Sequence, residues 1–369
     1  MQNTFPWQRV VVKIGSALIA PEKQGCSSRY LLAIAQFVVR CRAQGIQVIL
    51  VSSGSVAAGA HLFPDHDNKS IKIKKAMAAA GQTEMMATWD RFFDFPTAQI
   101  LLTHGDLRDR ERYVSIRDTI FSLLDNNILP IINENDTVTT DALKVGDNDN
   151  LSAMVAAAAD ADSLIICSDV DGLYDQNPNL HPDAKLISWV ADIDASIYAM
   201  AGGATSDVGT GGMRTKIQAA EKATSHGITT FIVNGFKESS FNLLLEGKNP
   251  GTQFQPYDSP MQEKLHWMTH TSKAQGEVVI SGDVPSPDAG GQLHLTSDEI
   301  KEVHGDFTVG DTILLVTDDG TKVAKAKSNY SSCLLNFIAE QDDEAFVSEF
   351  QHRTGPIISA DDYAPLEKK

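Results

Sequence analysis

Two lysines far apart in the chain stand beside glycine and hydroxyl residues in a pattern that suits phosphate binding. Lys13 precedes Gly15 and Ser16 at the end of an apolar run, and Lys216 ends the stretch G-T-G-G-M-R-T-K, which opens a helical pattern. Backbone N–H groups at such positions and an ammonium group together stabilise an anion. The spacings of the Walker A loop and of the dinucleotide fingerprint are absent. The pattern predicts a phosphate site outside the ordinary P-loop and dinucleotide folds.

Carboxylate and amide side chains form two dense clusters between these lysines. One is N-E-N-D at 133–136, and the other is D-N-D-N at 147–150. Such acceptor and amide pairs suit the ammonium and carboxylate groups of an amino acid. A calcium loop is the rival interpretation, but the EF-hand pattern needs a central glycine and a closing glutamate that this register lacks. The stretch S-S-G-S at 52–55 is either a second anion cradle or a tight turn of small residues.

Short apolar runs rich in β-branched residues alternate with helical periodicity through the first two thirds of the chain. The predicted strands are Arg9–Ile14, Gln47–Val51, Ala98–Leu102, Ile128–Ile132, Ser163–Cys167 and Thr230–Val233. Between the first two, Arg29–Gln44 has one apolar stripe and is followed by Gly45, which predicts a helix and its end. This order predicts an α/β fold with a mainly parallel sheet, helices on both faces, and ligands at the carboxyl ends of the strands.

The pattern changes to period two near residues 255–275, which predicts a second, β-rich domain. Its clearest strands are Gly276–Ile280, Thr312–Thr317 and Lys322–Lys327, with D-D-G as the hairpin turn between the last two. We therefore expect a catalytic domain at 1–258, a linker at 259–274 and a small β domain at 275–369.

The composition is that of an ordinary globular protein. The chain has 369 residues, 42% of them hydrophobic, and a net charge of −17. This charge disfavours general binding to nucleic acids or to anionic membranes. The sequence shows no apolar run long enough to span a membrane and no signal peptide, so we expect a cytoplasmic protein. The four cysteines are scattered, which favours reduced thiols, and Cys41 and Cys167 are expected in the core.

Together the motifs resemble the amino-acid kinase family, and within it the branch that phosphorylates the side chain of glutamate. The matching motifs, in order, are K-I-G-S, S-S-G-S-V-A-A-G, A-A-A-G-Q, I-N-E-N-D, K-V-G-D-N-D-N-L-S-A, S-D-V-D-G-L-Y, G-T-G-G-M-R-T-K and G-T-Q-F. The fourth and fifth separate this branch from aspartokinases, acetylglutamate kinases and uridylate kinases. The β-rich end is similar to the PUA module of many bacterial members, although its G-x-x-L turn lacks the usual lysine.

The resemblance implies roles for individual residues. Lys13 and Lys216 would act on the phosphates, with Asp149 as their organiser. The nucleotide site would consist of Lys13, Gly15, Ser168, Asp169, Thr210, Gly211, Gly212, Met213, Arg214, Thr215 and Lys216. The glutamate site would consist of Ser53, Gly54, Asn133, Asp136, Asp147 and Asn148. Ser55 stands where the family more often has alanine, a change that we expect to be tolerated.

The resemblance also implies the activity: transfer of the γ-phosphoryl group of ATP, with Mg²⁺, to L-glutamate as the first step of proline biosynthesis. It further implies inhibition by proline near the 133–144 loop and a homo-oligomer, a dimer or tetramer. The magnesium ligands cannot be assigned from the sequence. The alternatives are a kinase of another small acid, an inactive proline sensor, or an RNA-binding role for the PUA-like domain. The RNA-binding role is disfavoured because 19 acidic and only 9 basic residues follow position 259, whereas an RNA-binding surface is basic.

Overall fold

The protein is described here by a computed structural model. The structure describes residues 6–22, 24–63, 70–139, 148–201, 212–258, 260–281, 295, 299–339, 356–359 and 362–366. The chain divides into two compact units, Met1–Met261 and Gln262–Lys369. In the described residues, no helix combines the length and the apolar character that crossing a bilayer requires.

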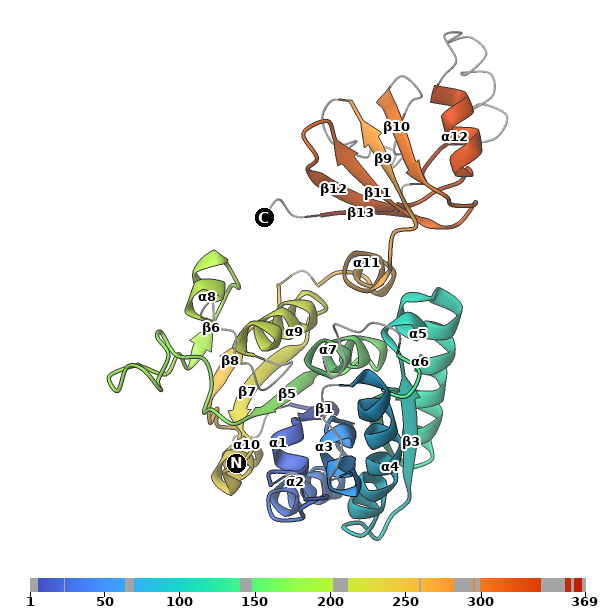
Figure 1. Ribbon diagram of the computed structural model, residues 1–369. Coiled ribbons are helices and arrows are strands. Elements are labelled where there is room, and N and C mark those ends of the chain that lie inside the picture. The colour runs from blue at the N-terminus through green and yellow to red at the C-terminus, as the bar shows by residue number, and fades with distance from the viewer. Residues whose placement is uncertain are drawn as a thin grey trace. The chain divides into compact units, whose positions relative to one another are not determined.

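The first unit is built on an eight-stranded sheet with the strand order β3-β4-β2-β1-β5-β7-β8-β6 (Figure 1). The strands are β1 (Arg9–Ile14), β2 (Gln47–Ser52), β3 (Thr97–Leu102), β4 (Leu129–Glu134), β5 (Ser163–Ser168), β6 (Trp189–Val190), β7 (Thr229–Asn234) and β8 (Thr252–Phe254). Neighbouring strands are parallel except β7 and β8, which are antiparallel. The predicted α/β fold with a mainly parallel sheet is confirmed.

Helices cover both faces of this sheet. They are α1 (Ser16–Ile19), α2 (Leu31–Ala43), α3 (Ser55–Gly59), α4 (Ile71–Asp90), α5 (His104–Arg108), α6 (Arg110–Asp125), α7 (Asn148–Ala158), α8 (Ala195–Met200), α9 (Met213–Ser225) and α10 (Glu238–Leu245), with a short 3-10 helix at Ala60–Leu62. Helix α2 packs on β2 and on α10, whereas α7 packs on β1, β5 and α9 (Figure 1). Helix α2 begins two residues later than predicted, and Gly45 follows it with the positive φ of a helix stop.

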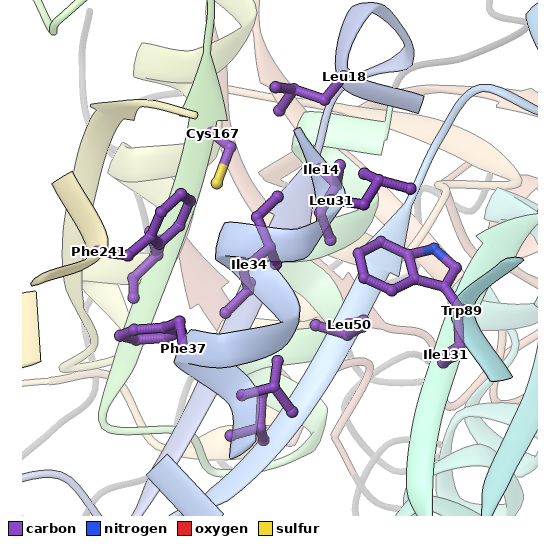
Figure 2. Packing of buried hydrophobic residues seen from close by; sticks show 14 of the residues in the cluster. Ile14, Leu18, Leu31, Ile34, Phe37, Leu50, Trp89, Ile131, Cys167 and Phe241 are labelled. Carbon is purple, nitrogen blue, oxygen red and sulfur yellow. The ribbon is translucent and has the colours of Figure 1, made fainter. Parts of the chain in front are cut away.

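The strand β1 is buried on both faces, and its successive side chains point to opposite faces of the sheet. Val12 and Ile14 join the apolar cluster that contains Leu31, Ile34 and Phe37 of α2 (Figure 2). Burying a side chain of this size stabilises the fold by about 1.5–3 kcal/mol. Because successive side chains of a strand point to opposite faces, Lys13 points to the other face, where α7 lies. The expectation that Cys41 and Cys167 are core residues is confirmed, since both are buried.

The second unit contains a smaller sheet with the strand order β10-β9-β11-β12-β13. Its strands are β9 (Gly276–Ile280), β10 (Ile300–Gly305), β11 (Thr312–Thr317), β12 (Lys322–Lys327) and β13 (Tyr363–Pro365). Its helices are α11 (Glu263–His266), a π-helix at Trp267–Thr271 and α12 (Ser332–Ala339). The three strands predicted here are confirmed, and the antiparallel β11 and β12 are joined at Gly320, which has a positive φ. The unit fits the predicted PUA-like domain.

The segment 259–274, which the sequence analysis gave as a linker, contains α11 and the π-helix. Both helices belong to the second unit. Inside this unit, the ammonium group of Lys325 donates to the carbonyl oxygens of Thr269 and Ser272. These carbonyls lie at the end of the π-helix, where no following helical turn supplies N–H donors. The described part of the segment is therefore structured.

Candidate active site

The carboxyl ends of the central strands bring the predicted motifs to one edge of the first sheet. In the register of the sheet, Lys13 of β1 stands beside Val51 of β2 and Ile166 of β5. The strand β4, which ends at Asn133 and Glu134, pairs with β2 on the side away from β1. Because all these strands run in the same direction, the loops that follow them open at the same edge.

Asp149 joins the two predicted phosphate lysines. Lys13 Nζ lies 2.5 Å from Asp149 Oδ1, and Lys216 Nζ lies 3.1 Å from Asp149 Oδ2. All three side chains are buried. Asp149 stands in the first turn of α7 and Lys216 in the first turns of α9, and these two helices pack against each other. The structure therefore brings together the two ammonium groups and the aspartate.

The electrostatics of this cluster keep Asp149 ionised. Burial alone would raise the pKa of Asp149, but the ammonium groups of Lys13 and Lys216 outweigh it and hold that pKa well below its usual range. Burial also lowers the pKa of Lys216, against the opposing attraction of Asp149, and the charge of Lys13 lowers it further. Two ammonium groups would repel each other by roughly 4 kcal/mol if they were brought to about 4 Å at an effective dielectric constant of ~20. Asp149, which pairs with both lysines, offsets their repulsion.

The start of α9 adds hydroxyl and backbone groups to the cluster. The Thr215 hydroxyl lies 2.8 Å from Asp149 Oδ2 and 2.8 Å from the carbonyl oxygen of Gly212. Gly212 is the residue before the helix and has an extended backbone, and Met213 is its first residue. The exposed Arg214 stacks its guanidinium over the ring of Tyr198, 5.5 Å from the centroid. Arg214 is thus held by an aromatic ring beside the cluster.

The ends of β1 and β5 supply the remaining described residues of the predicted nucleotide site. The Ser168 hydroxyl donates to Asp169 Oδ1 at 3.1 Å, and the charge of Asp169 favours the protonated form of Lys216. A Cβ at Gly15 would lie 4.0 Å from Lys13 Nζ and 3.7 Å from the carbonyl oxygen of Cys167. Gly15 therefore lies against Lys13, and Asp169 acts on Lys216 from the end of β5.

A second group of polar residues lies at the ends of β2 and β4. The Ser55 hydroxyl donates to Asp136 Oδ2 at 2.8 Å, and both residues are buried. Burial raises the pKa of Asp136, and the hydrogen bond from Ser55 opposes this rise. Among the residues that the structure describes, Asp136 Oδ1 and Asn148 Oδ1 are buried acceptors without a hydrogen-bond partner. Buried acceptors of this kind suit a cationic ligand group.

Ser53 and Gly54 shape the loop between β2 and α3. The Ser53 hydroxyl donates to the carbonyl oxygen of Ile14 at 2.8 Å, so Ser53 can offer a ligand only acceptor lone pairs through its side chain. Gly54 has a φ of 105°, and a Cβ there would lie 2.9 Å from the Cβ of Ile19. The turn therefore requires glycine on two grounds, conformation and space.

Asn133 contacts a glutamine that the sequence analysis did not assign to the site. Asn133 Nδ2 donates to Gln82 Oε1 at 2.9 Å, and Asn133 Oδ1 accepts from the backbone N–H of Glu134 at 2.8 Å. Gln82 belongs to α4 and ends the motif A-A-A-G-Q. That motif was the only sequence signal for Gln82, and it carries no chemistry by itself.

Two glycines explain how α4 reaches the site. A Cβ at Gly59 of α3 would lie 2.0 Å from the carbonyl oxygen of Met77, and one at Gly81 would lie 2.0 Å from that of Ser55. The two helices are therefore in backbone contact. Gln82 therefore directly follows the residue of α4 that touches Ser55, the first residue of α3.

Three predicted site residues, Asp147, Thr210 and Gly211, lie outside the described residues. Within the described ranges, no group of three or more His, Cys, Asp or Glu side chains is arranged to hold a metal ion. Asp149 already pairs with two ammonium groups, so it does not offer a free carboxylate. The described side chains thus provide no metal centre of their own.

Comparisons with known proteins identify the family. Residues 8–234 match the Amino acid kinase family. "Glutamate 5-kinase 1" of Pseudoalteromonas translucida is 66% identical over 99% of this chain and 100% of its own length. "Glutamate 5-kinase" of Idiomarina loihiensis is 52% identical over 98% of each chain. "Glutamate 5-kinase" of Salinibacter ruber is 44% identical over 96% of this chain and 98% of its own length. The chain belongs to the amino acid kinase family and, within it, to the glutamate 5-kinases.

Proposed function

We propose that this protein transfers the γ-phosphoryl group of ATP to the side-chain carboxylate of L-glutamate, giving L-glutamyl 5-phosphate for proline biosynthesis. The relatives named above, each matched over 98% or more of its own length, support this reaction. The structural observation that carries it is the pair of buried ammonium groups on Asp149. A site with two positive charges beside a helix N-terminus suits the transfer of an anionic group.

The nucleophile needs no general base. A glutamate side chain has a pKa of about 4.3, so its carboxylate is already ionised at pH 7. Asp149 has a pKa held below its usual range, which makes it a poor proton acceptor. We assign it instead the role of holding Lys13 and Lys216 in place.

The main barrier is electrostatic, because an anionic nucleophile must approach an anionic phosphate. Lys13 would neutralise charge on the transferred group, and Lys216 would stabilise the leaving phosphate. Gly15, Ser168, Asp169 and the residues at the start of α9 would line the nucleotide. Mg²⁺ would supply further charge neutralisation at the phosphates.

The amino-acid end of the substrate fits the polar group at β2 and β4. Asp136 and Asn148 present buried acceptors that lack a partner among the described residues, and these would accept from the ammonium group of glutamate. Ser53, Gly54 and Asn133 would complete this part of the site, with Asp147 as a further expected member. We also propose inhibition by proline at this part of the site, a homo-oligomeric state and a cytoplasmic location where ATP and glutamate are available.

Steady-state assays of ADP release test this function. The substrates are L-glutamate, L-aspartate, acetylglutamate and UMP, and we expect turnover with L-glutamate. Lys13→Ala and Lys216→Ala should each lower kcat by about 10²–10³, as expected when a transition-state donor is removed. Lys248→Ala is the control, because Lys248 pairs with Glu246 on the surface. Activity on another substrate alone, or near wild-type kcat in both site variants, would refute the proposal.

A further inference from the structure

The side-chain amide of Gln82 is a hydrogen-bond donor without a partner. Its nitrogen, Nε2, is buried and makes no hydrogen bond among the residues that the structure describes. A buried donor left unsatisfied is costly, and native proteins rarely keep one without a reason. A ligand that accepts a hydrogen bond would remove this cost.

The hydrogen-bond network fixes which end of the amide is free. Asn133 Oδ1 accepts from the N–H of Glu134, so the other end of the Asn133 amide is the Nδ2 donor. This donor contacts Gln82, so the contacting atom of Gln82 must be the oxygen Oε1. The Nε2 donor of Gln82 is therefore left for another partner.

The position of Gln82 links it to the amino-acid end of the site. Gly81, its neighbour in α4, lies against the backbone of Ser55, and Ser55 holds Asp136 through its hydroxyl. Asp136 Oδ1 is an unpartnered acceptor in the described part of the chain, whereas Gln82 Nε2 is an unpartnered donor. In an α-amino acid, the ammonium and carboxylate groups share one carbon atom. The acceptor Asp136 is bonded to Ser55, and the donor Gln82 follows the glycine that lies against Ser55, so the two groups match that pair.

We propose that Gln82 binds the α-carboxylate of the amino-acid substrate and that Asn133 is the positioning residue that turns the Gln82 amide toward it. This inference rests on the proposed function and adds a residue that binds the α-carboxylate, the carboxylate of glutamate that is not phosphorylated. The γ-carboxylate must instead reach the phosphates at Lys13 and Lys216. Gln82 therefore contributes to substrate recognition and not to the transfer step.

The selectivity between L-glutamate and L-isoglutamine tests this inference. L-isoglutamine keeps the ammonium group and the γ-carboxylate but carries an α-carboxamide. Gln82→Glu replaces the N–H donors by an acceptor of the same shape, which repels a carboxylate and accepts from a carboxamide. We expect kcat/KM for glutamate to fall about 10–100-fold, chiefly through KM, and the preference for glutamate over isoglutamine to fall by about 10².

Asn133→Asp should produce the same change in preference. The new carboxylate accepts from Gln82 Nε2, so the Gln82 amide turns over and presents its oxygen to the substrate. Gln82→Met, of similar size and without donors, should raise KM for glutamate without favouring isoglutamine. Gln44→Glu adds the same charge at an exposed position of the first unit and is the control.

Calorimetric binding of the two amino acids to the same proteins separates this inference from the proposed function. If the wild-type protein binds glutamate but does not phosphorylate it, the proposed function fails and the binding preference still tests Gln82. If Gln82→Glu and Gln82→Met bind both amino acids as the Gln44→Glu control does, Gln82 does not contact the substrate. A loss confined to kcat, with KM and preference unchanged, also overturns the inference.

Discussion

Asp149→Asn is the substitution that most directly tests the charge arrangement of the site. Asparagine keeps the shape of aspartate but removes the charge shared by Lys13 and Lys216, at 2.5 and 3.1 Å. Both ammonium groups are buried and would lose their counterion. Removing one partner of a buried ion pair costs about 3–5 kcal/mol. At a urea slope of about 2 kcal/mol/M, this lowers the unfolding midpoint by roughly 1.5–2.5 M.

The pH dependence gives this prediction a second, independent readout. The folded pKa of Asp149 is depressed, so its stabilising effect is complete above the unfolded pKa of about 3.9 and is lost as the pH falls further. The attraction of Asp149 raises the pKa of Lys216 against the effect of burial, so its loss should lower the folded pKa of Lys216 further in the variant than in the wild-type protein. Between these two folded pKa values, the folded wild-type protein keeps the proton that the folded variant has lost. The deficit in stability should therefore shrink as the pH rises through this window and stay constant above it.

Urea titrations of the wild-type protein, Asp149→Asn and Glu246→Gln at several pH values measure both effects. Glu246 forms an exposed ion pair with Lys248 at 2.7 Å, so Glu246→Gln removes a paired charge without exposing a buried one. We expect its midpoint to stay near the wild-type value. If Asp149→Asn unfolds at the same midpoint as this control at neutral pH, the ammonium groups do not depend on Asp149.

Two further substitutions test the contacts of Ser55, the first residue of α3. Ser55→Ala removes the hydroxyl that donates to Asp136, so we expect KM for glutamate to rise about tenfold and the acidic limb of kcat/KM to move to higher pH, because the pKa of Asp136 rises. Initial rates over a pH series measure this, and an unmoved limb with an unchanged KM would contradict it. Gly81→Ala puts a Cβ 2.0 Å from the carbonyl oxygen of Ser55 and should destabilise the protein by about 1–3 kcal/mol or more. Thermal unfolding measures this against Gly105→Ala, whose Cβ meets only Thr103 Oγ1 at 3.4 Å, and equal melting temperatures would show that the helices separate easily.

The central strands of the sheet could be predicted from the sequence because they are buried on both faces. Arg9–Ile14 and Ser163–Ser168 are short apolar runs with β-branched residues. Their local preference for β-structure agrees with their buried position in the sheet. The strands β6 and β8 were not predicted. They have two and three residues, which is too short to show an alternation of apolar and polar residues in the sequence.

The lysine pair could be predicted from the sequence, and its partner Asp149 came from the family resemblance. Glycine and hydroxyl residues beside Lys13 and Lys216 mark their loops, but spacing alone does not show that two loops about 200 residues apart meet. The proposed role of Gln82 could not be predicted, because it depends on the contact of Gln82 with Asn133 of β4 and on that of Gly81 with α3, which no local pattern encodes. That serine in place of alanine at position 55 leaves activity intact remains a prediction. In the structure, the Ser55 hydroxyl donates a hydrogen bond to Asp136.

The alternation of side chains along β1 has a consequence for how this sequence can change over time. Lys13 lies on the face of α7, whereas its neighbours Val12 and Ile14 belong to the apolar cluster around α2. A slip of β1 by one position would bury the ammonium group in that cluster and turn a hydrocarbon side chain toward Asp149. We therefore expect selection to remove insertions and deletions inside this strand. Exchanges among branched aliphatic residues at Val12 and Ile14 would leave Lys13 beside Asp149.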